Sequence, residues 1–499
     1  MRYSILLSTA ATLVVTPGLF AGNTDKNQTT PTFNRDIAPV IYKNCAGCHH
    51  EGEVAPFALM SYQDVAKRAQ QIAAITQARV MPPWKATPGY GDFANDRSLT
   101  DQQIATIRDW AAHGAPEGDA KDKIEAPKFV AGWQGGQPDQ ILRMSQPFAA
   151  PAEGPDEFRC FVIPLGAKED EYVQGVEFHP GNRKIVHHAI MFLDNSGEAR
   201  KLETVPGQGY DCVGGPGLAI EGALGGWAPG TLPSNLPDGL SHTVKKGSDL
   251  VLQLHYHLDG KPEQDRSEIG LRFAKAPPTK GLTLLVVGNQ KIDIPAGDDR
   301  YVVKASSILP MDATAIAVFP HAHYLCKDMK VNAHLPDGTT APLIWIKDWD
   351  FNWQGSYGYK APIKLPRDTR IDMEYTYDNS AANPHNPSNP PKEVRFGEQT
   401  TNEMAFAFVS VTVDTPEEVP VFQREARAEF VASMIENGVD ESGLDPKSVA
   451  RLKMLFAAFD KNHNGKIDPE ERHALVEFLA NRQQQQRQRE EPKQPQEQH

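Results

Sequence analysis

A long series of short apolar runs, separated by Gly, Pro, Asp and Asn, most constrains how this chain can fold. The runs occupy residues 161–164, 184–192, 249–258, 282–287, 315–319, 370–377 and 405–413. They are rich in Val, Ile, Phe and Tyr, which favour strands, and the residues between them are typical of turns. The pattern predicts two antiparallel, jelly-roll-like β-sandwiches, over residues 128–275 and 276–415.

The segments on either side of these runs have helical signals. Ser61 and Thr100 are placed to cap helices that end near Ala78 and Gly114, which predicts a small all-α domain over residues 31–118. Helical periodicity returns over residues 420–482, and the Gln-rich residues 483–499 are expected to form a disordered tail. The predicted fold class is therefore multidomain, with helical units before and after the two sandwiches.

The helical unit contains a C-x-x-C-H motif at Cys45, Cys48 and His49. Two thiols at this spacing can bond covalently to the two vinyl groups of one porphyrin, and the adjacent imidazole can bind its iron. The alternative is a metal-binding or redox C-x-x-C pair. The motif predicts one covalently bound haem c, and the unit resembles class I cytochrome c domains.

The second axial ligand of this haem is predicted to be Met81, which two prolines follow in a stiff loop. A thioether ligand raises the reduction potential, which suits electron transfer. The alternatives are His50, Met60 or His113, or an open position.

Three pairs of histidines lie on predicted strands within a short stretch of the chain. The pairs are His187 and His188, His255 and His257, and His321 and His323. Side chains at i and i+2 of a strand share one face, so the second and third pairs can each chelate one ion. The adjacent His187 and His188 would diverge on a flat strand, so both can bind one ion only at a twist or bulge.

The order of these motifs, followed by Glu403-Met404, resembles the copper type II, ascorbate-dependent monooxygenases, which include dopamine β-monooxygenase and the peptidylglycine α-hydroxylating enzymes. Further matches are residues 158–160 (FRC), 225–230 (GGWAPG) and 375–379 (YTYDN). The resemblance implies an electron-transferring copper on His187, His188 and His255, with His257 in reserve. It implies a second, oxygen-activating and catalytic copper on His321, His323 and Met404.

The chain departs from the peptide-amidating members of that family. An Arg that lies two residues before their H-x-H is Phe319 here, and polar or Cys positions after the Met are Ala405, Phe406 and Phe408. These side chains cannot bind a peptide carboxylate, so a glycine-extended peptide is not the expected substrate.

A twelve-residue segment near the carboxyl end matches the EF-hand calcium loop, with Gly465 at its sixth position. The predicted calcium ligands are Asp460, Asn462, Asn464, Lys466 through its carbonyl, Asp468 and Glu471. The absence of a second loop in the sequence favours a structural calcium site over a calcium sensor.

The amino terminus predicts export. Arg2 and the apolar residues 5–15 are typical of a signal peptide that is cleaved after Ala21, against the alternative of an uncleaved anchor. A periplasmic or secreted location permits disulfides. Cys160, Cys212 and Cys326 can form one disulfide and leave one free thiol, or form none, and their spacing alone does not choose the pair.

Together these features predict an exported dicopper monooxygenase that hydroxylates a C–H bond of a small molecule with O2. Its attached haem would complement or replace ascorbate, with electrons from an external donor. The rivals are an electron-transfer or copper-binding haem protein without catalysis, and a calcium-stabilised scaffold protein. The net charge of -13, with no basic stripe and no later apolar span, argues against nucleic acid or a membrane as partner.

Overall fold

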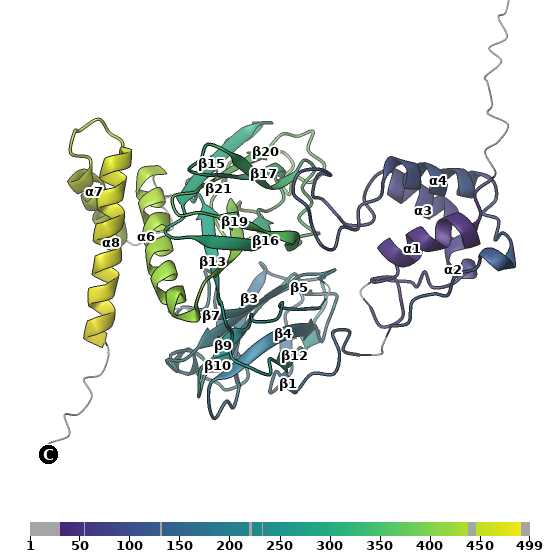
Figure 1. Ribbon diagram of the computed structural model, residues 1–499, viewed down its shortest axis with the longest axis horizontal. Helices are drawn as coiled ribbons and strands as arrows, with labels where there is room; N and C mark the ends of the chain where they lie inside the picture. The colour runs from purple at the N-terminus through teal and green to yellow at the C-terminus, as the bar shows by residue number, and fades with distance from the viewer. Residues whose placement is uncertain are drawn as a thin grey trace, which may run out of the picture.

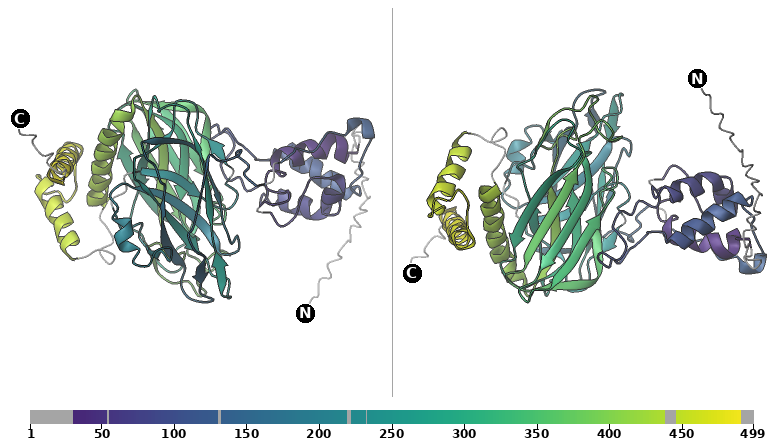
Figure 2. Two further views of the ribbon diagram at one scale, coloured as in Figure 1. Left: turned by 90° about the horizontal axis from the view of Figure 1, so that it is seen from below. Right: turned by 90° about the horizontal axis from the view of Figure 1, so that it is seen from above.

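The computed structural model describes residues 30–53, 55–129, 132–218, 222–231, 233–437 and 446–490. Antiparallel sheets form the centre of the molecule (Figure 1). A helical unit lies at one end of these sheets and the carboxyl-terminal helices lie at the other, as both further views agree (Figure 2). The expected signal peptide lies outside the described residues.

The first β region, residues 140–273, contains two five-stranded sheets and a short two-stranded ladder. Its strands are β1 (Gln140–Arg143), β2 (Phe148–Ala150), β3 (Glu157–Pro164), β4 (Glu171–His179), β5 (Val186–Asp194), β6 (Tyr210–Asp211), β7 (Gly222–Trp227), β8 (Ser234–Asn235), β9 (His242–Val244), β10 (Asp249–Tyr256), β11 (Glu263–Asp265) and β12 (Glu268–Phe273). Strand β10 is buried along its whole length and lies between β3 and β5. The sheet therefore fixes the positions of the side chains on β5 and β10.

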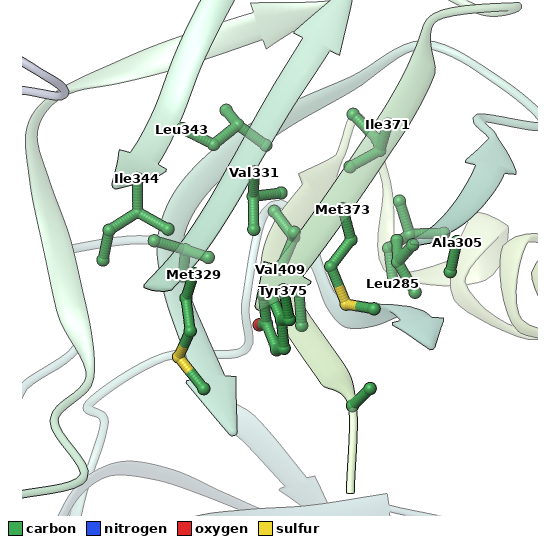
Figure 3. Packing of buried hydrophobic residues seen from close by; sticks show 14 of the residues in the cluster. Leu285, Ala305, Met329, Val331, Leu343, Ile344, Ile371, Met373, Tyr375 and Val409 are labelled. Carbon is green, nitrogen blue, oxygen red and sulfur yellow. The ribbon is translucent and has the colours of Figure 1, made fainter. Parts of the chain in front are cut away.

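The second β region, residues 281–413, contains two four-stranded sheets and another two-stranded ladder. Its strands are β13 (Gly281–Gly288), β14 (Asp293–Ile294), β15 (Tyr301–Ile308), β16 (Ala313–His321), β17 (Cys326–His334), β18 (Thr340–Ile346), β19 (Tyr357–Leu365), β20 (Arg370–Tyr377), β21 (Val394–Arg395) and β22 (Phe406–Val413). Residues from both large sheets, including Val331, Met373 and Val409, interdigitate in one apolar core (Figure 3).

The helical unit begins with η1 (Phe33–Ile37) and contains α1 (Ala38–Asn44), α2 (Tyr62–Ala66), α3 (Ala69–Gln77) and α4 (Asp101–Ala112), followed by η2 (Ala120–Asp122). The predicted caps are confirmed. The Ser61 hydroxyl accepts a hydrogen bond from the Asp64 amide, and Thr100 forms a capping box with Gln103.

The long loop between α3 and α4 leaves this helical unit and joins the second β region. Ala86 bridges to Ile346 and Phe93 to Tyr359, and both side chains belong to the core of that region. The loop also reaches the first β region, where Arg97 donates to the carbonyl of Gly230 at 3.4 Å. It is therefore held by both β regions.

The carboxyl-terminal segment contains η3 (Pro416–Glu418), α6 (Val419–Asn437), α7 (Pro446–Phe459) and α8 (Pro469–Glu490); a short helix, α5 (Ala199–Leu202), lies in the first β region. Phe422 and Ala426 of α6 pack in the core of the second β region. Helix α8 continues past the expected end at residue 482, and residues 491–499 lie outside the described part of the chain.

The predicted fold class, a small all-α cytochrome c domain with two β-sandwiches and a helical EF-hand segment, is wrong. Antiparallel sheet is the main regular structure of the described residues, with 22 strands in six sheets beside eight α-helices. The reason is that apolar side chains outside the expected sandwiches, such as Ala86, Phe93 and Phe422, are buried among the strands. Local periodicity identifies elements but does not identify the layer against which they pack.

Replacing Phe422 by Ala tests whether α6 is part of the β core. Phe422 is fully buried, so its truncation should lower the free energy of unfolding by about 3–5 kcal/mol. Urea unfolding monitored by circular dichroism measures this change. The matched control is Phe478→Ala on α8, where the side chain is 43% exposed and the expected effect is much smaller. Equal effects would contradict the packing of α6 described above.

Candidate metal centre

Three of the predicted histidines converge at the end of the β5–β10 ladder. His255 of β10 pairs with His188 of β5, and the next pair along is Tyr256 with Val186. His187 is therefore the extra residue of a β-bulge, which turns its side chain toward that of its neighbour. This confirms the expectation that adjacent histidines need a bulge to face one point.

The spacing of the ring nitrogens fits a metal ion. The Nδ1 atom of His188 lies 3.3 Å from Nδ1 of His187 and 3.3 Å from Nδ1 of His255. Tetrahedral imidazole ligands at metal–nitrogen distances of about 2.0–2.1 Å stand about 3.3 Å apart. Among the described residues, His187, His188 and His255 form the group of three His, Cys, Asp or Glu side chains whose ligand atoms all lie within 4.8 Å of one another.

Two members of the three-histidine cluster, His187 and His188, are kept uncharged by their partly buried surroundings. Burial lowers the pKa of His187 to about 3 and lowers the pKa of His188 well below its usual value. His255 is 1% exposed and its ring stacks on Phe158 at 4.2 Å. Neutral imidazoles are the form that binds metal, so His187 and His188 can bind an ion at neutral pH without first losing a proton.

His257 is not a member of this cluster. Its side chain is 57% exposed, and its Nδ1 contacts the Asp156 carboxylate at 3.0 Å. His257, the reserve ligand expected from the sequence, therefore lies outside the three-histidine cluster.

The second histidine pair lies at the end of β16. The rings of His321 and His323 are 5.3 Å apart. The Nδ1–H of His321 donates to Gln354 Oε1 at 2.6 Å, and that of His323 donates to the carbonyl of Asn402 at 3.1 Å. Both Nε2 lone pairs are therefore left for a ligand, and burial lowers the two pKa values to about 4 and about 3.

Met404 is brought to this pair by its backbone. His321 pairs with Phe406 in the β16–β22 ladder, so continuing the antiparallel register by two residues brings Met404 opposite His323. The neighbouring Glu403 carboxylate accepts the amides of His323 at 2.8 Å and Leu325 at 2.6 Å. Burial raises the pKa of Glu403 to about 8. The role of the Met404 sulfur as a copper ligand stays a prediction.

One aromatic side chain lies between the two histidine groups. The ring of Phe351 stacks on His187, with centroids 4.8 Å apart, and its edge meets His323 at 5.6 Å. The centroids of the His187 and His323 rings are therefore no farther apart than the sum of these two centroid distances. Sequence reasoning missed Phe351 and Gln354, because both follow β18 in a loop with no histidine, cysteine or spacing motif.

The residues of the C-x-x-C-H motif fit a covalently bound haem. Cys45 and Cys48 are free thiols, and the Nδ1–H of His49 donates to the carbonyl of Phe57 at 3.0 Å. The opposite nitrogen, Nε2, is then the one that can bind iron. Among the described residues, Met81 makes no contact with His49. Of the alternative axial ligands, His50 is buried and its Nε2 has no hydrogen-bond partner.

The predicted calcium loop connects α7 and α8. Its side-chain oxygens point inward and accept loop amides: Asp460 from Asn464 and Gly465, and Glu471 from Lys461 and Asp468. Asn462 and Asn464 both contact Asp468. The Lys466 amide donates to Asn464 Oδ1, and calcium binding by the loop stays a prediction.

Of the three remaining cysteines, Cys160 and Cys212 form a disulfide, and Cys326 is a buried free thiol. The disulfide joins β3 to the loop after β6, beside the sheet that carries the three-histidine cluster. No helix of the described residues is long and apolar enough to cross a membrane.

No family model and no curated protein matches this chain. Among solved structures, the VP2 subviral particle of infectious bursal disease virus aligns with 67% of this chain and 91% of its own, at 9% identity and a TM-score of 0.15. The Gt strain structure of the same virus aligns with 71% and 95%, at 10% identity and a TM-score of 0.14. These scores are too low to bear on the fold or the site.

Substituting His188 tests the three-histidine cluster as a metal site. His188→Ala removes the nitrogen that lies next to both others, so copper binding at this site should be lost and the bound copper should fall by one ion per chain. Elemental analysis after dialysis measures the stoichiometry. The control is the exposed His385→Ala, which should keep the parent's copper content. Retention of all copper by the His188 variant would rule the cluster out.

Substituting Met81 and His50 in parallel tests the haem ligation. Met81→Ala should remove the weak red absorption band of iron–thioether ligation and lower the reduction potential, because the softer ligand raises it. His50→Ala should change neither. The reverse result, with the spectrum altered only by the His50 substitution, would transfer the ligand role to His50.

Proposed function

We propose that this protein is a copper-dependent monooxygenase that receives electrons through its attached c-type haem. The observation that carries the proposal is the convergence of two histidine groups, one from each β region, on the same phenylalanine ring, Phe351. Two metal ions held this close could exchange electrons through protein without a partner protein between them. The resemblance of the motif order to the copper type II monooxygenases supports the same assignment.

The two groups are suited to different tasks. His187, His188 and His255 would hold copper through three nitrogens, which suits electron transfer. His321 and His323 with Met404 would hold copper through two nitrogens and a thioether, a donor set that favours Cu(I) and leaves a position for O2. When bound, the copper ions and the haem would supply one-electron redox chemistry and O2 activation.

The overall reaction consumes one O2, two electrons and two protons, replaces one C–H bond of the substrate by C–OH, and releases one water. The chain's own contribution is positional. Gln354 and the carbonyl of Asn402 fix which nitrogens of His321 and His323 face the ion. Phe351 places an apolar ring against one histidine of each group.

The surroundings of His321 favour a substrate without a carboxylate. On the face of β16 and β22 that carries His321, its neighbours are Phe319, Phe406 and Phe408, and Phe319 pairs with Phe408 in register. None of these side chains can bind an anion. An apolar C–H donor is the substrate class that such neighbours accept.

Met404→Ile tests the proposal, because it keeps an apolar side chain of similar bulk and removes the sulfur. Copper at the three histidines should remain and still be reduced, whereas O2 consumption coupled to substrate hydroxylation should fall to background. An oxygen electrode with product analysis by mass spectrometry measures both, over a panel of apolar substrates.

The control for this variant is Met454→Ile, on the exposed face of α7, which should keep the parent's turnover. Full coupled turnover by Met404→Ile would contradict the assigned role. A copper-loaded parent that transfers electrons but hydroxylates nothing in the panel would favour the non-catalytic electron-transfer protein.

A further inference from the structure

The Asp156 carboxylate, which belongs to none of the motifs, contacts three side chains from both β regions. Its Oδ2 atom lies 3.2 Å from Nε2 of His255 and accepts the hydroxyl of Thr400 at 2.8 Å. Its Oδ1 atom lies 3.0 Å from Nδ1 of His257. The His255 contact is short, although His255 Nε2 does not meet the full geometry of a hydrogen bond.

The contact with His255 uses the ring nitrogen that does not face the cluster. His255 directs Nδ1 toward His188 and Nε2 toward Asp156. Histidines that bind a metal commonly donate their other N–H to a carboxylate, which fixes the tautomer and raises the basicity of the ligand nitrogen. With its proton held on Nε2, His255 offers an Nδ1 lone pair to the metal.

The contact with Thr400 reaches the other histidine group. Thr400 belongs to the turn that precedes Met404, and two residues later the carbonyl of Asn402 accepts the Nδ1–H of His323. In the same turn Glu398 accepts the amide of Gly214, so the turn is held against the first β region at a second point. One carboxylate therefore connects a ligand of the first group to the turn that orients the second.

We propose that Asp156 is a positioning residue that fixes the metal-binding tautomer of His255 and, through Thr400, aligns the two metal sites with each other. This inference rests on the proposed function only in taking the three histidines as a metal site. It adds a residue from outside every sequence motif, placed just before β3, to the machinery of that site.

Asp156→Asn is the deciding substitution, because both carboxylate oxygens are in use. An amide has one oxygen, so it cannot accept all three donors, and its NH2 group favours the tautomer that puts the proton on Nδ1 of His255. Copper affinity of the three-histidine site should fall about 10- to 100-fold, as for other carboxylates behind a metal-bound histidine. Competition titration measures the affinity, and electron paramagnetic resonance of the Cu(II) form should show altered nitrogen coordination.

Asp265→Asn is the matched control. Asp265 is another buried carboxylate of the first β region, bonded to Tyr256 and Ser267, with no contact to a histidine of the cluster. Its loss should lower thermal stability and leave copper affinity and the resonance spectrum unchanged. Thr400→Val should keep the affinity of the three-histidine site and weaken copper binding at His321 and His323.

The outcomes distinguish a failure of the role assigned to Asp156 from a failure of the proposed function. If the parent binds copper at the three histidines and Asp156→Asn binds it with equal affinity and the same spectrum, the role of Asp156 is overturned and the proposed function stands. If the parent binds no copper there, the proposed function and this inference both fail. A loss of affinity in Asp265→Asn equal to that in Asp156→Asn would reduce the effect to general destabilisation and overturn the inference.

Discussion

The pairing of β5 with β10 is the interaction on which the candidate metal centre depends. Strand β10 is buried along its length, so its register against β5 cannot slip by one residue without moving apolar side chains out of the core. That register sets His255 against His188, and the bulge one step further adds His187. The same sheet continues through β3, which carries the disulfide and begins one residue after Asp156, so the ligands and their support share one ladder.

Three histidines of the candidate sites, His49, His321 and His323, solve the same physical problem in the same way. A buried imidazole loses favourable hydration, which keeps it neutral, and one of its two nitrogens must then carry a proton that needs an acceptor. A carbonyl or side-chain oxygen accepts that proton at His49, His321 and His323. The nitrogen left for a ligand is therefore Nε2 in these three, whereas the nitrogen of His255 that faces its cluster is Nδ1. The position of the neighbouring oxygen thus decides which nitrogen can bind a ligand.

The sequence predicted the ligand candidates better than the architecture. Histidine pairs at alternating positions, a C-x-x-C-H motif and helix caps at Ser61 and Thr100 are local signals, and the structure places the first three copper ligands together. The fold class failed because Phe93 and Phe422 are far along the chain from the strands that bury them. Phe351, Gln354 and Asp156 were also missed. A loop phenylalanine or a lone aspartate has no periodicity, and only the tertiary contact gives it a role.

The loop between α3 and α4 has a mechanical consequence. It pairs with the second β region at Ala86 and Phe93 and also binds the first β region through Arg97 and Gly230. Lys85 adds ion pairs to Asp348 and Asp350, next to Phe351. A hinge motion that separated the two β regions would have to detach this loop from one of them. Its hydrogen bonds would then break and its buried rings would be exposed. The loop therefore holds the two β regions in place relative to each other. It favours a fixed separation between the two histidine groups.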